Sequence, residues 1–164
     1  MNNKKSIIIT QAGLIAALYT VLTIAISAFN LASGAIQVRI SEALTILPVF
    51  TPAAVPGLFI GCMVSNLVTG CALWDVVFGS VATLIGALGT RMLRGKGALA
   101  ALPPILSNTI IVPFILAYVY GVPDGIPFLM LTVGIGEVIS CGILGLLLKK
   151  VLEPQHKRIF KTQD

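Results

Sequence analysis

The chain has 164 residues, of which 57% are hydrophobic and only 10% are charged, with a formal net charge of +5. Soluble domains carry roughly 25% charged residues, and the mean hydropathy of this chain is +1.01. These values exclude a soluble domain and predict an all-α integral membrane protein. We expect a single transmembrane domain over residues 1–164, with almost no chain left for a soluble module such as an ATPase.

The first expected helix covers residues 6–28, long enough to cross a hydrocarbon core of roughly 30 Å. Its start, MNNKK before an apolar run, resembles a signal peptide. The run exceeds a usual signal sequence and no convincing A-x-A site closes it, so we expect a retained helix. The polar loop of residues 30–37 then leads to Arg39 and a short apolar segment that ends at Pro48.

Three prolines at four-residue spacing separate this short second helix from a third helix at residues 54–68; they are Pro48, Pro52 and Pro56. A fourth helix opens at Trp74 and Asp75 and reaches the basic stretch RMLRGKG. The fifth and sixth helices are expected at residues 98–120 and 126–148, separated by the turn-rich GVPDG.

Six membrane-spanning helices would place both termini on one side. The basic N-terminus, the basic loop between helices four and five, and the basic tail then all lie in the cytoplasm, as the positive-inside rule requires. Five spans would turn residues 91–96 outward and break this pattern. The positive charge is therefore interpreted as a topology signal, and no nucleic-acid partner is expected. The protein is predicted to be a multi-pass protein of the cell membrane.

Between Ser6 and Thr90 only three residues carry a formal charge, and two of them, Arg39 and Glu42, lie three apart at the start of the second helix. This spacing places them on one helical face, where they can pair. One interpretation is an interfacial ion pair that ends a helix. The other is that the preceding loop and this helix start form the roof of an outward-facing substrate pocket.

The third charge, Asp75, follows Trp74 in an outer loop, close in topology to Asn66 and Thr69 at the outer end of helix three. An aromatic ring beside a carboxylate suits a flat ligand that is cationic or rich in N–H groups. The alternative is an interfacial tryptophan followed by an aspartate that caps the helix.

Glu137 lies about twelve residues into the sixth helix and so near mid-membrane, and Asn108 is at comparable depth in the fifth. The two side chains could satisfy each other. Glu137 could instead accept hydrogen bonds from paired N–H groups of a ligand, as on the edge of a guanine. A third possibility is that Glu137 is the proton relay of a solitary proton-coupled transporter.

Small residues recur at four-residue spacing in helices one and three: Ala12 and Ala16, Gly13 and Ala17, and Gly57 and Gly61. Such stripes let helices approach closely, either inside the protein or against another membrane subunit. No span contains a histidine, G-x-S-x-G is absent, and the three cysteines show no metal-binding spacing. We therefore expect neither an enzyme, nor a metal site, nor a cofactor.

Five blocks in this order resemble one transporter family: AIQVRISEALTILPVF, PGLFIGCMVSNLVTG, ALWDVVFGSVATLIGAL, ALPPILSN and VGIGEVIS. Together they are similar to the QueT queuosine-precursor transporters, which are substrate-binding S components of energy-coupling factor (ECF) importers. The resemblance implies a six-helix subunit that captures a 7-deazaguanine, such as 7-aminomethyl-7-deazaguanine, from outside. It would hand the ligand inward by toppling against a transmembrane coupling protein and two ATPase subunits.

Under this resemblance Glu137 would accept from the N–H groups of the base, Trp74 would stack on it, and Asp75 or Glu42 would take the aminomethyl ammonium. Ala12 and Ala16 would form the surface that docks the coupling protein. Two other hypotheses remain: the solitary proton-coupled transporter, and a structural subunit whose polar residues only pack helices.

Overall fold

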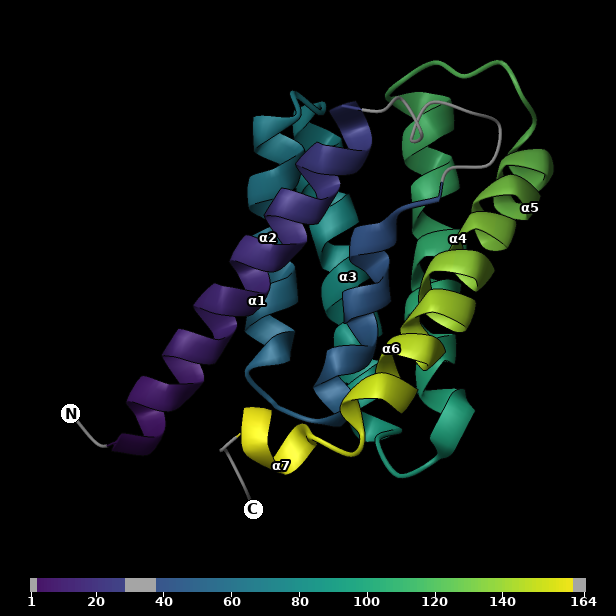
Figure 1. The fold of residues 1–164 in the computed structure, drawn as a ribbon. Coiled ribbons are helices and arrows are strands. Elements are labelled where there is room, and N and C mark those ends of the chain that lie inside the picture. Colours follow the sequence, from purple (N-terminus) through teal and green to yellow (C-terminus); the bar gives the residue numbers. More distant parts are fainter. Residues whose placement is uncertain (1–2, 29–37, 161–164) are drawn as a thin grey trace.

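The computed structural model describes residues 3–28 and 38–160, and within these ranges the fold is helical without strands (Figure 1). The loop expected at residues 30–37 lies outside the described residues. The elements in chain order are α1 (Asn3–Ala28), the 3₁₀ helix η1 (Ile40–Val49), α2 (Ala54–Val68), α3 (Leu73–Met92), the 3₁₀ helix η2 (Gly97–Ala101), α4 (Leu102–Tyr118), α5 (Ile126–Glu137), the π-helical η3 (Val138–Leu144), α6 (Gly145–Leu152) and α7 (His156–Ile159).

Four stretches of the described chain have the length and hydropathy of membrane spans: Lys5–Ser27, Leu73–Met92, Gly97–Tyr118 and Ile126–Leu152. Two apolar helices are shorter, Ile40–Val49 and Ala54–Val68. The sequence placed α2 at its observed bounds and found the start of the sixth helix. It missed the π-helical turns, which leave the apolar pattern unchanged, and the short α7, whose four residues lie in the basic tail and are too few to show a helical pattern.

The segments run alternately up and down the bundle (Figure 1). The start of α1 and the whole of α7 lie at one end of the molecule. The end of α1, the turn between α2 and α3, and the connection from α4 to α5 lie at the other end. We call the latter the cavity end, because the cavity described below opens there.

The short helix η1 lies at the centre of the bundle. Every residue from Ser41 to Pro48 is buried, and η1 contacts α1, α2, α3 and α6 as well as η2 and η3. A 3₁₀ helix rises about 2.0 Å per residue, so ten residues extend about 20 Å, whereas an α-helix of this length extends about 15 Å. The 3₁₀ geometry therefore lets a short segment reach deep into the bundle.

α1 and α2 approach closely at two glycines of α2. A Cβ atom added to Gly57 would lie 2.8 Å from the carbonyl oxygen of Ala12, and one added to Gly61 would lie 3.0 Å from the Cα of Ala16. Ala12 and Ala16 thus lie in the interface between α1 and α2. Internal packing explains this stripe, and the expected docking role for these two alanines has no support from their position.

We predict that Gly61→Ala destabilises the protein by about 1–3 kcal/mol, because the added methyl group overpacks the α1–α2 interface. Its Cβ would also lie 2.9 Å from the Cβ of Tyr19. Gly13→Ala is the matched control, since a Cβ there meets nothing within 4 Å. Thermal unfolding of the purified variants in detergent measures the difference. Equal melting temperatures for the two variants would show that the close approach is not required.

Candidate functional site

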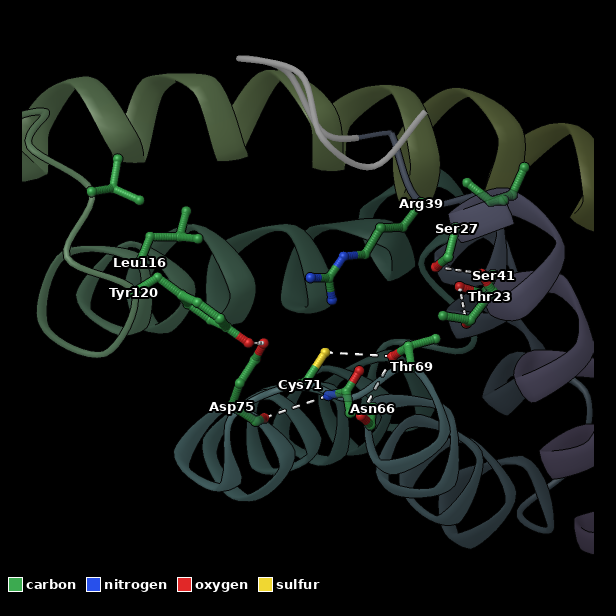
Figure 2. Close-up of a pocket in the computed structure, with 12 residues that line it drawn as sticks. Thr23, Ser27, Arg39, Ser41, Asn66, Thr69, Cys71, Asp75, Leu116 and Tyr120 are labelled. Atoms are coloured by element: carbon green, nitrogen blue, oxygen red, sulfur yellow. Dashed lines mark hydrogen bonds between the residues drawn. The ribbon is translucent and has the colours of Figure 1, made fainter. Parts of the chain in front are cut away.

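A cavity of about 410 Å³ opens at the cavity end of the bundle (Figure 2). This volume is within the about 300–1,000 Å³ that small-molecule sites occupy. Its walls come from α1, the start of η1, the α2–α3 region, and the end of α4 with the following loop. The lining residues are Thr23, Ile26, Ser27, Arg39, Ser41, Asn66, Thr69, Cys71, Asp75, Leu116, Tyr120 and Val122.

Asp75 forms the acidic wall of this cavity from the first turn of α3, where the helix dipole favours a carboxylate. It is 6% exposed and accepts a 2.9 Å hydrogen bond from the hydroxyl of Tyr120. The same hydroxyl accepts from the backbone N–H of Ala72 at 3.1 Å. Desolvation and the contact with Asp75 both raise the pKa of Tyr120, so the phenol keeps its proton and remains the donor to Asp75.

Asn66 contacts the backbone of Asp75. Its Nδ2 donates to the backbone oxygen of Asp75 at 3.4 Å, and the side chain is 3% exposed. Gly79 makes room for both residues, because a Cβ there would lie 3.0 Å from Asp75 Oδ1 and 3.3 Å from Asn66 Nδ2. The sequence expectation that Asn66 and Asp75 lie near each other is confirmed.

Arg39 points its guanidinium into the middle of the cavity (Figure 2). Its backbone is extended, with φ −102° and ψ 100°, and its N–H donates to Ser140 Oγ at 3.1 Å. The ion pair with Glu42, one of the two interpretations that the sequence left open, is not formed, since Arg39 makes no ion pair within 4.0 Å among the described residues. Arg39 precedes the helix and Glu42 lies inside it, so the two side chains leave the backbone in different directions. Asp75 and Glu42 are nevertheless within electrostatic reach of the guanidinium.

Glu42 is buried beside Glu137 and Cys141, deeper in the bundle than the cavity. One carboxylate oxygen of each glutamate and the sulfur of Cys141 lie within 4.8 Å of one another. Glu42 is 1% exposed and Glu137 is 7% exposed. The interpretation that Glu42 belongs to the roof of an outward-facing pocket is therefore wrong for this residue, which is buried and does not line the cavity. It faces inward because its Oε1 accepts a hydrogen bond from the hydroxyl of Tyr19 on α1.

The π-helical segment η3 positions this acidic pair. Cys141 donates to Glu137 Oε2 at 3.1 Å and lies 3.5 Å from the backbone oxygen of Glu42. The hydroxyl of Thr45 donates to the Cys141 sulfur at 3.3 Å. Asn108, which is 4% exposed, lies close to both carboxylates. π-Helical turns within α-helices are frequent at functional sites, and this one brings a central helix and two acids together.

Comparison with known proteins identifies the family of this chain. The model of the QueT transporter family matches residues 9–154. The chain belongs to this family. It is 34% identical over 86 residues to the queuosine precursor transporter QueT of Lactococcus lactis subsp. cremoris (strain MG1363). That alignment covers 52% of this chain and 50% of the relative, so the chain spans about half the length of the curated relative that it matches. No solved structure matches.

Membership of a transporter family and the four long apolar helices together show a multi-pass membrane protein. In this QueT family member Trp74 does not line the cavity. It is 59% exposed and stacks on Phe78 with ring centroids 5.8 Å apart. Neighbouring residues on an α-helix point about 100° apart, and here Asp75 faces inward while Trp74 lies on the exposed side. The N-cap of α3 is Ala72, so Asp75 does not cap the helix as the alternative interpretation supposed.

Sequence reasoning missed two tyrosines that bind the acids, Tyr19 and Tyr120. Tyr120 follows a span, where a tyrosine is typical of a membrane interface. Tyr19 lies in an apolar run with no polar neighbour on either side except Thr20. A usable signal was present on α1 in Thr23 and Ser27, which are four residues apart and therefore share the face that lines the cavity.

We predict that Tyr19→Phe destabilises the protein by about 1–3 kcal/mol, because it leaves the buried Glu42 carboxylate without its hydroxyl donor. Tyr118→Phe is the control, as Tyr118 is 77% exposed and stacks on Phe114. Each variant removes one hydroxyl group, and thermal unfolding in detergent measures the stability of both. A Tyr19 variant as stable as the Tyr118 variant would contradict this role.

Proposed function

We propose that this protein is the substrate-specific membrane subunit of an importer that takes up a queuosine precursor. The observation that carries the proposal is the match of the QueT transporter model to residues 9–154. The Lactococcus lactis relative is a queuosine precursor transporter by name, which supports the ligand class. The cavity supports capture of a small molecule, because its volume and its mixture of polar and apolar walls are those of a small-molecule site.

The proposed ligand is a 7-deazaguanine such as 7-aminomethyl-7-deazaguanine. Its base carries N–H donors and a carbonyl acceptor, and the cavity offers a complementary set. The Asp75 carboxylate accepts hydrogen bonds, the Arg39 guanidinium donates them, and the Asn66 amide can do both. Leu116 and Val122 supply apolar surface for the flat ring. Glu137 and Asn108 lie deeper and would receive the inner end of the ligand.

In the proposed topology six segments cross the membrane and both termini are cytoplasmic. The segments are α1, η1, α2, α3, η2 with α4, and α5 continued by η3 and α6. The basic residues support this orientation: Arg91, Arg94, Lys96, Lys149 and Lys150 lie on elements at the end of the bundle opposite the cavity. The cavity end would then face outward, where a captured ligand arrives.

Uptake would be driven by an ECF module consisting of a transmembrane coupling protein and two ATPase subunits. Ala12 and Ala16 pack against α2, so we propose that the docking surface lies elsewhere on α1. The side of α1 that carries Leu14, Leu18 and Val21 is exposed, with 61%, 46% and 62% of these side chains accessible. An exposed apolar side fits either lipid or another membrane subunit.

We predict that the isolated protein binds 7-aminomethyl-7-deazaguanine and co-purifies with a deazaguanine that mass spectrometry detects. Asp75→Asn should weaken binding about tenfold or more, because a hydrogen bond to a carboxylate becomes one to a neutral amide. Asp124→Asn is the matched control, since Asp124 is exposed in the loop between α4 and α5. Isothermal titration calorimetry in detergent gives both affinities.

A second measurement separates this proposal from the solitary proton-coupled transporter. Protein reconstituted alone in vesicles should accumulate no ligand under a pH gradient, and uptake should appear when the coupling protein, the ATPases and ATP are added. Uptake by the protein alone that is abolished in Glu137→Gln would instead establish the proton-coupled mechanism. Failure to bind any deazaguanine would refute the proposed ligand.

Labelling of Cys71 can show which side of the membrane the cavity faces. This residue is half-buried in the cavity wall, whereas Cys62 and Cys141 are buried in the bundle. We predict that a membrane-impermeant maleimide labels Cys71 from outside intact cells, that ligand slows this labelling, and that Cys71→Ser abolishes it. Labelling of Cys71 only in inverted membrane vesicles would reverse the proposed topology.

A further inference from the structure

The acidic pair of Glu42 and Glu137 is unusual because its charges are unbalanced. The two carboxylates have oxygens within 4.8 Å of each other, and the third member of the cluster is a thiol. Arg39 is within electrostatic reach of Glu42 but makes no ion pair within 4.0 Å among the described residues. Asp75 adds a further acid above them. Two carboxylates at this separation in a medium of low dielectric constant do not both carry a charge unless a cation is near, so the pair either holds a proton or binds a cation.

The pair also has an unused acceptor. Glu42 is 1% exposed, and its Oε2 has no hydrogen-bond partner. A buried carboxylate oxygen without a donor costs free energy, more so at membrane depth, where water is scarce. Cys141 does not balance the pair, because it donates its thiol proton to Glu137 Oε2. A positively charged group that carries hydrogen-bond donors would complete this arrangement.

We propose that Glu42 and Glu137, together with Asn108, form a subsite for a protonated primary amine of the ligand. This inference rests on the proposed function and specifies the charge of the substrate. An ammonium group has three N–H donors. Two acceptors are offered to it, Glu42 Oε2 and the carboxylate of Glu137, and the side chain of Asn108 lies close to both acids.

The place of the subsite agrees with an amine on a short arm. Tyr19, which binds Glu42, is four residues before Thr23 in the cavity wall, and Ser41 of the wall directly precedes Glu42. Four residues of an α-helix rise about 6 Å, so the acidic pair lies about one helical turn beneath the cavity. A flat base in the cavity would thus need only a short substituent to bring its amine to the two glutamates.

The first test uses the wild-type protein and two ligands that differ only in this group. The 7-aminomethyl and 7-hydroxymethyl forms of 7-deazaguanine are similar in shape, and both can donate a hydrogen bond, but only the amine is charged. We expect the aminomethyl form to bind at least about tenfold more tightly, since hydrogen bonds to a charged group are roughly twice as strong. Equal affinities would overturn the subsite.

The second test uses variants that remove one charge and keep the shape. Glu42→Gln and Glu137→Gln should each weaken binding of the aminomethyl form about tenfold or more and change binding of the hydroxymethyl form less than about threefold. Glu153→Gln is the matched control, because Glu153 is 61% exposed and pairs with Lys149 at 3.6 Å. Equal losses for both ligands would show that the glutamates only maintain the fold.

The two tests separate the inference from the proposed function. Wild-type protein that binds neither ligand refutes the proposed function and the subsite with it. Wild-type protein that binds both equally leaves the proposed function standing and refutes the amine subsite alone. If a glutamine variant fails to fold, as judged by size-exclusion chromatography, the wild-type comparison still decides the question.

Discussion

Ile40–Val49 is too short to cross lipid as an α-helix, and it carries polar side chains that a membrane cannot solvate. The other segments must therefore surround it. α1, α2, α3 and α6 all contact it, and η3 supplies hydrogen-bond partners through Ser140 and Cys141. The position of Arg39 at its start and of Glu42 inside it follows from this single constraint. The cavity and the acidic pair both adjoin this one short buried helix, which carries a few polar side chains in an otherwise apolar sequence.

The polar groups of the interior are arranged at two depths, and each depth has its own tyrosine. Tyr120 donates to Asp75 near the cavity, and Tyr19 donates to Glu42 below it. A phenol suits both positions because its ring packs among apolar side chains while its hydroxyl donates to the acid. Arg39 lies within electrostatic reach of Asp75 and of Glu42, and so links the two depths without a close ion pair to either.

Much of the fold could be predicted from apolar run lengths and prolines, as the bounds of α2 show. The placement of Asn66 beside Asp75 followed from helix directions alone. The position of Glu42 could not be predicted, because it depends on a 3₁₀ helix and on a tyrosine more than twenty residues away. Trp74 was misplaced because composition does not reveal which of two neighbouring residues faces inward. Periodicity also gives no sign of a π-helical segment, which has the same residue types as an α-helix.

The cost of each charge explains why the basic and acidic residues of this chain have different roles. Lysines and arginines near the ends of spans reach water with their long side chains, so they cost little and can be retained for orientation alone. A carboxylate at the centre of a span costs about 2.5–3.5 kcal/mol on insertion scales. Glu42 and Glu137 would each have this cost if ionised. Their oxygens lie within 4.8 Å of each other, so the charge of one would make ionisation of the other less favourable. Helix packing alone would be served better by two apolar residues, whereas the proposed amine subsite would give both carboxylates a partner.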